Sequence, residues 1–231
     1  MFLQGVALHK AGLLAAALLL PVLSGVNLPM PEIVALLIAI SFAAGLNTYA
    51  TVGTLGLLGR YHVLVLPEGL HALQDWWVIA AAVAMFVVEF FADKIPAFDL
   101  IWNAMHTFVR VPVAALMVYK ATASLSPAQQ MLATIVGGLI ALAAHGGKTA
   151  ARAAVTPSPE PFSNGALSLT EDAVAIGLTW FATRHPYTAA GLVLVGLVFV
   201  VLILRFVLRS LKALFRGAEE QIEHGSPAPA A

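Results

Sequence analysis

Long apolar segments alternate with short polar connections along this chain. A helix of roughly 20 apolar residues is long enough to cross a hydrocarbon core of about 30 Å. Segments near this length run approximately over Pro31–Leu58, Trp76–Ala92, Asn103–Ser124, Pro127–Ala154, Leu167–Thr183 and Pro186–Leu208. The pattern therefore predicts an all-α, polytopic transmembrane bundle with six core helices.

The pattern does not decide whether the segment Asn103–Ser124 crosses the membrane or lies on its surface. His106, Arg110, Pro112 and Lys120 interrupt its apolar run. It is interpreted as the sixth core helix, and the alternative is an amphipathic helix that lies on the membrane surface.

Both ends of the chain differ from this central region. Residues 1–30 contain the apolar run Ala11–Met30, which is either an additional N-terminal membrane helix or a cleaved signal-like segment. The membrane domain is expected over residues 31–216, because the prolines around Met30 break the first run. Residues 217–231 are acidic and then rich in proline and alanine, and are expected to form a disordered tail.

The composition strengthens the membrane interpretation and removes several function classes. Hydrophobic residues make up 60% of the chain and charged residues only 10%, far from the usage of soluble domains. Lysine plus arginine equal aspartate plus glutamate at 12 each, so no charge excess points to nucleic acid. Cysteine is absent, which excludes disulfides and thiolate chemistry. No motif for a cofactor or a metal ion is present, and none is expected.

Basic residues near the segment ends predict an orientation. Cytoplasmic connections of membrane proteins carry an excess of lysine and arginine. In the six-helix arrangement, three basic residues fall on one side, namely Arg60, Lys120 and Arg184. The other side carries Lys94, Arg110, Lys148, Arg152, Arg209, Lys212 and Arg216. This bias places the C-terminus in the cytoplasm.

Two stretches of small residues resemble one another at a distance of three segments. Ala43–Thr51 aligns with Ala144–Arg152, with identities at alanine, glycine, threonine and alanine, and with Asn47 opposite Lys148. Because the second copy lies an odd number of helices later, it is inverted relative to the first. Inverted halves with broken helices form transporter sites. The hypothesis is a 3+3 repeat over residues 31–124 and 127–216 with broken or re-entrant segments, and the alternative is chance similarity.

Polar side chains inside the first segment need partners within the membrane. Asn47, Thr48 and Tyr49 lie in the middle of Pro31–Leu58. Unpaired polar groups in lipid are costly, so these side chains are expected to face a cavity or a re-entrant bend. The alternative is that they only hydrogen-bond between packed helices.

Two acidic residues end the segment that begins at Trp76. Glu89 and Asp93 are one helical turn apart, and Glu89 is at hydrocarbon depth. An ionisable group at that depth indicates a functional site, through proton coupling or through pairing with Arg110, Lys148 or Arg152. Asp93 is interpreted first as an interfacial cap.

The stretch around Lys148 is a candidate anion site. Its Gly-Lys-Thr ending resembles a phosphate-binding loop, but Leu142 occupies the position of the first glycine and no strand precedes it. Lys148 and Arg152 are four residues apart on one helical face, with Thr149 beside them. Such a pair can hold phosphate or carboxylate. The alternative is that both cations reach out to headgroups.

The last candidate residues follow a proline-rich connection. Residues 156–165 contain alternate prolines and are expected to be extended and stiff. Ser168 and Glu171 fit a capping box that would begin the next helix and account for Glu171. Asp172 remains for a salt bridge or for the site, as does His145 next to the candidate anion site.

Three of these motifs also carry a family resemblance. Ala43–Tyr49, Glu89–Asp99 and Gly147–Arg152 resemble a family of small bacterial integral membrane proteins known as domain of unknown function 4126. The resemblance spans roughly Pro31–Leu208. It implies the bacterial inner membrane, and it implies no activity.

The leading hypothesis is a transporter or permeability protein for a small anionic or phosphate-bearing substrate, including a lipid headgroup. Lys148, Arg152 and Thr149 would bind the anion, and Asn47, Thr48 and Tyr49 would line the opposite wall. Charge coupling is assigned to a second set, comprising Glu89, Asp93, Arg110, His145 and Asp172. Expected partners are membrane lipids and the substrate, and a homo-oligomer stays open.

Two other function classes stay open. One is a membrane-embedded, lipid-modifying enzyme that uses His145 or His106 with a carboxylate. The sequence favours a non-enzymatic role, because it has no His-Glu-x-x-His motif and no nucleophile elbow, and no catalytic residue is assigned. The other is a structural or assembly subunit whose polar residues only join helices.

Overall fold

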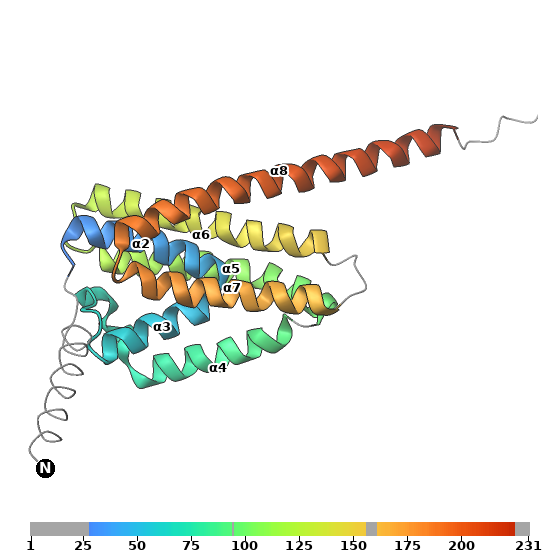
Figure 1. Cartoon of the computed structure of the whole chain (residues 1–231). Coiled ribbons are helices and arrows are strands. Elements are labelled where there is room, and N and C mark those ends of the chain that lie inside the picture. The colour runs from blue at the N-terminus through green and yellow to red at the C-terminus, as the bar shows by residue number, and fades with distance from the viewer. Residues whose placement is uncertain (1–27, 94, 156–160, 225–231) are drawn as a thin grey trace, which may run out of the picture.

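The computed structural model describes residues 28–93, 95–155 and 161–224. These residues are almost entirely helical (Figure 1). The elements are α2 (Met30–Leu46), α3 (Thr48–Arg60), the 3-10 helix η1 (Glu68–Gln74), α4 (Trp76–Ala92), α5 (Pro96–Ala121), α6 (Pro127–Val155), α7 (Pro161–Ala182) and α8 (Pro186–His224). The all-helical prediction is confirmed, while nearly all of the N-terminal run lies outside the described residues.

The apolar character of the helices supports a membrane protein. Within the described residues, three spans are long and apolar enough to cross a membrane: Ile101–Ala121, Pro127–Arg152 and Pro186–Ser210. A fourth candidate joins η1 and α4, which meet at a bend of 65°. Large apolar side chains such as Trp77, Phe108 and Phe199 are exposed on the bundle, as expected of a surface that faces lipid.

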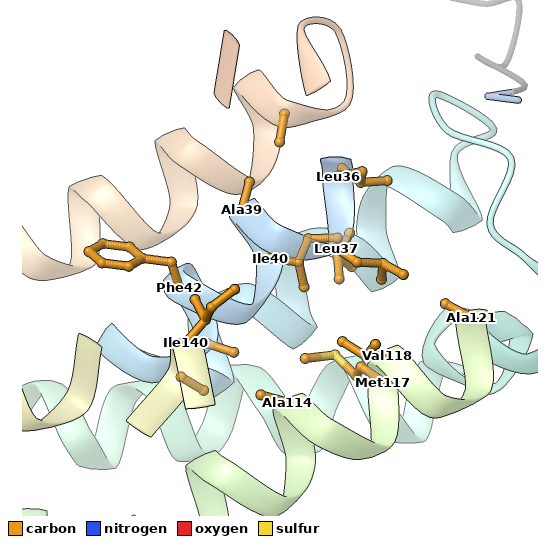
Figure 2. Close-up of a cluster of buried hydrophobic side chains, with 14 of the residues drawn as sticks. Leu36, Leu37, Ala39, Ile40, Phe42, Ala114, Met117, Val118, Ala121 and Ile140 are labelled. Carbon is orange, nitrogen blue, oxygen red and sulfur yellow. The ribbon is translucent and has the colours of Figure 1, made fainter. Parts of the chain in front are cut away.

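Helix α5 is a core element of this bundle. It continues through Pro112 to Ala121, and its buried face packs between α2 and α6. Figure 2 shows this layer, in which α2 contributes Leu36 to Phe42, α5 contributes Ala114 to Ala121 and α6 contributes Ile140. This packing favours the core helix over the alternative of a surface helix, and the part of α5 over Ile101–Ala121 is long and apolar enough to cross a membrane.

The segment expected as one span over Pro31–Leu58 is instead two helices. Asn47 separates α2 from α3 with an extended backbone, at φ −148° and ψ 102°. Val34, near the start of α2, shares a cavity with Leu125 in the α5–α6 turn. Beyond α3, Gly69 of η1 lies against Lys120, close to the same turn. Both outer ends of α2 and α3 thus lie at one end of the bundle, and the two helices form a hairpin whose tip is Asn47.

Close packing against α6 holds this hairpin in place. A Cβ atom on Gly45 would lie 2.4 Å from the Ala141 carbonyl oxygen and 2.7 Å from the Ala144 Cβ. Only glycine allows the backbones of α2 and α6 to approach this closely. The stretch before Asn47 therefore lies directly against the stretch before Lys148.

Helix α8 extends past the other helices (Figure 1). It has 39 residues, which corresponds to about 59 Å of helix and to nearly twice the thickness of a hydrocarbon core. The helix continues past residue 217, where the sequence predicted a disordered tail, as far as His224. The rest of that tail, residues 225–231, lies outside the described residues.

Candidate functional site

Seven charged side chains gather in the interior between the hairpin tip and helices α4 to α7. Each of these residues is at most 7% exposed. They are Glu89 and Asp93 at the end of α4, Arg110 on α5, Lys148 and Arg152 on α6, and Glu171 and Asp172 on α7. We call this set the charge cluster. Burying so many ions is costly unless each is compensated, so their pairing decides what the cluster can do.

Lys148 is at the centre of the charge cluster. Its Nζ atom is 3.3 Å from Glu89 Oε1, 3.2 Å from Glu171 Oε2 and 3.5 Å from Asp93 Oδ2. It also donates to the backbone carbonyl of Leu46 at 3.1 Å. Four acceptors surround an ammonium group that has only three hydrogens to donate. Three carboxylates and one backbone carbonyl oxygen thus surround the Lys148 ammonium group.

The break at Asn47 creates one of these acceptors. In a continuous helix the Ala50 amide would donate to the Leu46 carbonyl. Here the Ala50 amide donates to Asn47 Oδ1 at 2.9 Å, so that Asn47 caps the start of α3. The Leu46 carbonyl is left open at the hairpin tip, and Lys148 takes the position of the missing helical donor.

Arg152 joins α4 to α7. Its Nη2 atom donates to Asp93 Oδ2 at 2.7 Å and to Glu171 Oε2 at 2.6 Å, and its Nε atom lies 3.4 Å from Glu171 Oε1. Ser168 donates to the same Asp93 oxygen at 3.3 Å. The two bonds from Nη2 are short and charge-assisted, and such hydrogen bonds are stronger than those between neutral groups.

Three sequence interpretations fail in this region. Lys148 and Arg152 are 3% and 1% exposed, so they do not reach out to headgroups. The connection expected to be extended over residues 156–165 is helical from residue 161 on, while residues 156–160 lie outside the described residues. Asp93 is the C-cap of α4, as predicted, but its carboxylate is buried and pairs with Arg152. Helix α7 begins at Pro161, which places Ser168 in the helix interior and removes the capping box.

The predicted capping box assigned Glu171 to a helix terminus, so Glu171 was not among the residues predicted for the site. Its carboxylate binds both Lys148 and Arg152 and is as central as Glu89. The usable signal was its spacing from Ser168, which places both side chains on one helical face. On this face of α7, Glu171 binds Arg152 and Ser168 binds Asp93.

Arg110 binds Glu89 and His145. Its Nη2 atom pairs with Glu89 Oε1, and its Nη1 atom lies 3.0 Å from His145 Nδ1. Because a guanidinium group only donates, His145 Nδ1 must accept. His145 Nε2 then carries the hydrogen, which fits its position 3.1 Å from the Asn103 carbonyl oxygen. His145 is therefore a neutral imidazole with both nitrogens engaged.

Tyr49 and His106 form a separate pair beside the charge cluster. His106 Nδ1 is 2.8 Å from the Trp102 carbonyl oxygen, to which it can only donate. In a neutral His106, Nε2 then accepts from the Tyr49 hydroxyl at 3.0 Å. In the described part of the chain, His106 and His145 hydrogen-bond to Tyr49, Thr107, Arg110 and the backbone carbonyls of Trp102 and Asn103, and neither imidazole pairs with a carboxylate.

The hydroxyls of both candidate threonines donate to backbone carbonyls four residues earlier, for Thr149 within α6 and for Thr48 across the break from α3 to α2. The Thr48 hydroxyl donates to the Ala44 carbonyl at 2.7 Å, and the Thr149 hydroxyl donates to the His145 carbonyl at 3.0 Å. In this conformation neither hydroxyl hydrogen is available to a ligand. Both can still accept a hydrogen bond.

Asp172 differs from the other carboxylates of the charge cluster. Its Oδ1 atom accepts from Asn47 Nδ2 at 2.8 Å. Its Oδ2 atom is buried and has no hydrogen-bond partner. Its one hydrogen bond therefore comes from an uncharged amide at the hairpin tip.

Two cavities in the described residues lie away from these charges. One of about 370 Å³ lies between α2, α5 and α6, and another of about 450 Å³ lies between α2, α7 and α8. Both are lined almost entirely by apolar side chains. The described residues also contain no group of three or more histidine, cysteine, aspartate or glutamate side chains arranged to hold a metal ion.

Comparison with known proteins identifies the family. The sequence profile of a domain of unknown function (DUF4126) matches residues 34–206, so the chain belongs to that family. The resemblance inferred from the three motifs is confirmed. No curated protein and no solved structure matches the chain.

Proposed function

We propose that this protein is an integral membrane transporter or permeability protein for a small anionic or phosphate-bearing substrate, including a lipid headgroup. One observation carries the proposal: Lys148 is bound by three carboxylates and by the open carbonyl of a broken helix. Irregular backbone at membrane depth is tolerated where it is buried in protein or lines a pathway. Broken helices and buried ions together are typical of transport sites.

In this proposal Glu171 occupies the position of the substrate anion. Its carboxylate is gripped by the Arg152 guanidinium and by the Lys148 ammonium, which is the arrangement that would hold a carboxylate or a phosphate. An entering anion replaces Glu171 when α7 moves away from α6. Glu89 and Asp93 then balance the charge of the two cations. The conformation described here is the closed state of this cycle.

The predicted inverted 3+3 repeat is not part of the proposal, because the two aligned stretches run in the same direction. Ser41 lies against Gly137 and Gly45 against Ala141, so α2 and α6 are parallel, and the break at Asn47 makes the number of helices between the stretches even. The aligned positions still join residues 31–124 to residues 127–216. Asn47 binds Asp172 on α7, and Lys148 binds Glu89 on α4.

We place the protein in a bacterial inner membrane with a cytoplasmic C-terminus. Arg110, Lys148 and Arg152 are buried and no longer count as basic residues of the connections. The remaining bias is smaller but has the same sign, with Lys94, Arg209, Lys212 and Arg216 opposed to Arg60, Lys120 and Arg184. Membrane lipids are the surrounding partners, and the proposal accommodates a homo-oligomer.

A structural or assembly subunit is the second candidate. It is favoured by the mutual pairing of the cations and carboxylates, because a permanently closed charge cluster would join α4, α5, α6 and α7 without moving a substrate. The two candidates differ in whether an external anion can replace Glu171. A flux measurement separates them.

The test is anion flux in vesicles containing the purified protein. Arg152→Lys keeps the charge but loses the bidentate fork, so it should lower the flux of the transported anion at least about tenfold while the helical content is retained. Arg205→Lys makes the same change on an exposed face of α8 and should leave the flux unchanged. Equal flux in the parent, in Arg152→Lys and in protein-free vesicles, across inorganic anions and anionic lipids, would reject transport.

A further inference from the structure

We infer that Asp172 is a proton-binding site that controls the hairpin tip through Asn47, and that the proton is the ion coupled to anion movement. The coupling to transport rests on the proposed function, whereas the proton site itself rests on geometry. Under this inference, proton coupling belongs to Asp172, which has no cation in an ion pair with it among the described residues, and no longer to Glu89 and Asp93, which are paired with cations.

The charge balance of the cluster provides the first argument. Among the described residues, the four carboxylates of the charge cluster face three cations, and His145 is neutral by its hydrogen bonds. With every carboxylate ionised, these seven described side chains together carry one excess negative charge in a buried position. A buried ion without a counter-ion is costly, and binding one proton removes this cost. One carboxylate of the cluster is therefore expected to be neutral.

The distribution of partners identifies which carboxylate that is. Glu89 contacts Arg110 and Lys148, while Asp93 and Glu171 each contact Lys148 and Arg152. Asp172 receives only the neutral amide of Asn47 on Oδ1, and its Oδ2 atom has no partner although the residue is only 5% exposed. The proton belongs on Oδ2, since this leaves the bond from Asn47 to Oδ1 intact.

The surroundings of Asp172 agree with this placement. Charged groups act on it from α6, through Lys148, and from α4, through Glu89 and Asp93. Lys148 is shared among three other carboxylates, so it does not serve as a dedicated counter-ion. Helix α8 lines an apolar cavity together with the next turns of α7 and adds no charge there. Asn47 is the neighbour that responds directly to the proton.

Asn47 connects this proton to the hairpin tip. One side-chain atom of Asn47 caps α3 through the Ala50 amide, and the other donates to Asp172. Loss of the proton places a full negative charge beside the tip and gives the cluster a net negative charge. That charge repels an incoming anion and attracts Lys148 away from the Leu46 carbonyl. Proton uptake by Asp172 therefore favours anion binding, and proton release opposes it.

Infrared spectroscopy of the full chain in lipid nanodiscs tests the proton site without any substrate. The parent should show the C=O band of a protonated carboxyl group at neutral pH, and the band should disappear in Asp172→Asn. Asp75→Asn makes the same change at an exposed position and should retain the band. Carboxyl-labelled aspartate should shift the band, which assigns it to an aspartate even if Asp172→Asn does not fold, and Asp93→Asn should retain the shifted band, which separates Asp172 from the other buried aspartate of the charge cluster. A parent without such a band, or a band shifted only by labelled glutamate, overturns the proposal.

Flux measurements separate this inference from the proposed function. An inward proton gradient should increase anion uptake by the parent, and Asp172→Asn should lose at least about tenfold of this increase while it still moves the anion. If the infrared band belongs to Asp172 but no anion moves, the proton site stands and the transport function fails. If anions move with equal gradient dependence in the parent and in Asp172→Asn, the coupling role of Asp172 fails.

Discussion

The stretches Ala43–Thr51 and Ala144–Arg152 have similar sequences but different backbone structures. The first breaks into two helices at Asn47, while the second continues through Lys148 as part of α6. An asparagine side chain has an oxygen that can cap the Ala50 amide, whereas a lysine has no acceptor and cannot cap. The lysine instead donates to the carbonyl that the break leaves open. One polar residue thus decides between a broken and a continuous helix, and the lysine of the continuous helix binds the carbonyl exposed by the break.

The largest effect should come from removing the cation of the continuous stretch. Lys148→Met leaves three carboxylates and the Leu46 carbonyl without their shared donor. Removal of one partner from a buried ion pair costs about 3–5 kcal/mol. The free energy of unfolding in detergent should fall by this amount, and Lys120→Met, at an exposed position, should change it little. Equal stability of both variants would show that Lys148 is not buried among the carboxylates.

Removing the cap of the broken stretch should have the next largest effect. Asn47→Ala loses the bond to the Ala50 amide and the bond to Asp172. Loss of the cap costs about 1–2 kcal/mol and the unsatisfied buried groups add to it, for a total of about 2–3 kcal/mol. Thr54→Ala, on the same helix, is the control. A loss below about 0.5 kcal/mol would mean that another group caps α3.

The aligned glycines should respond with opposite signs. Gly45→Ala places a Cβ 2.4 Å from the Ala141 carbonyl oxygen and should cost about 1–3 kcal/mol by forcing α2 away from α6. Gly146→Ala meets nothing within 4 Å and should stabilise α6 by about 0.5–1 kcal/mol through helix propensity. Thermal unfolding of both variants measures the difference. Destabilisation of similar size at both positions would contradict the packing described here.

The aligned threonines should differ, and Thr149 should show the smallest effect. The Thr149 hydroxyl donates to the His145 carbonyl within α6, whereas the Thr48 hydroxyl at the start of α3 donates to the Ala44 carbonyl of α2, across the break. Thr149→Val should change the free energy of unfolding by less than about 1 kcal/mol, because the His145 carbonyl keeps its helical donor, and Thr48→Val should cost about 1–2 kcal/mol, because it removes a bond across the break. Equal losses in the two variants, measured in the same detergent, would contradict this difference.

Sequence patterns predicted the positions of several helices because apolar runs and prolines mark them locally. The predicted Trp76–Ala92 has the bounds of α4, and the predicted Pro127–Ala154 ends one residue before α6 does. The polar run Asn47–Tyr49 indicated a re-entrant bend, and the structure has a helix break there. The pattern could not decide between this break and its alternative, since polar residues in an apolar run also fit a continuous helix with interhelical bonds. The central role of Glu171 was hidden by a local capping pattern. Its partners Lys148 and Arg152 come from another helix, and such distant contacts leave no local signal.

A high-resolution density map of the protein in a lipid nanodisc is the decisive measurement for the hairpin and its contact with Lys148. The map should show a helix break at Asn47, with Lys148 Nζ within hydrogen-bonding distance of the Leu46 carbonyl and of Glu89 and Glu171. A continuous helix through Asn47, with Lys148 extended towards the headgroups, would contradict this arrangement.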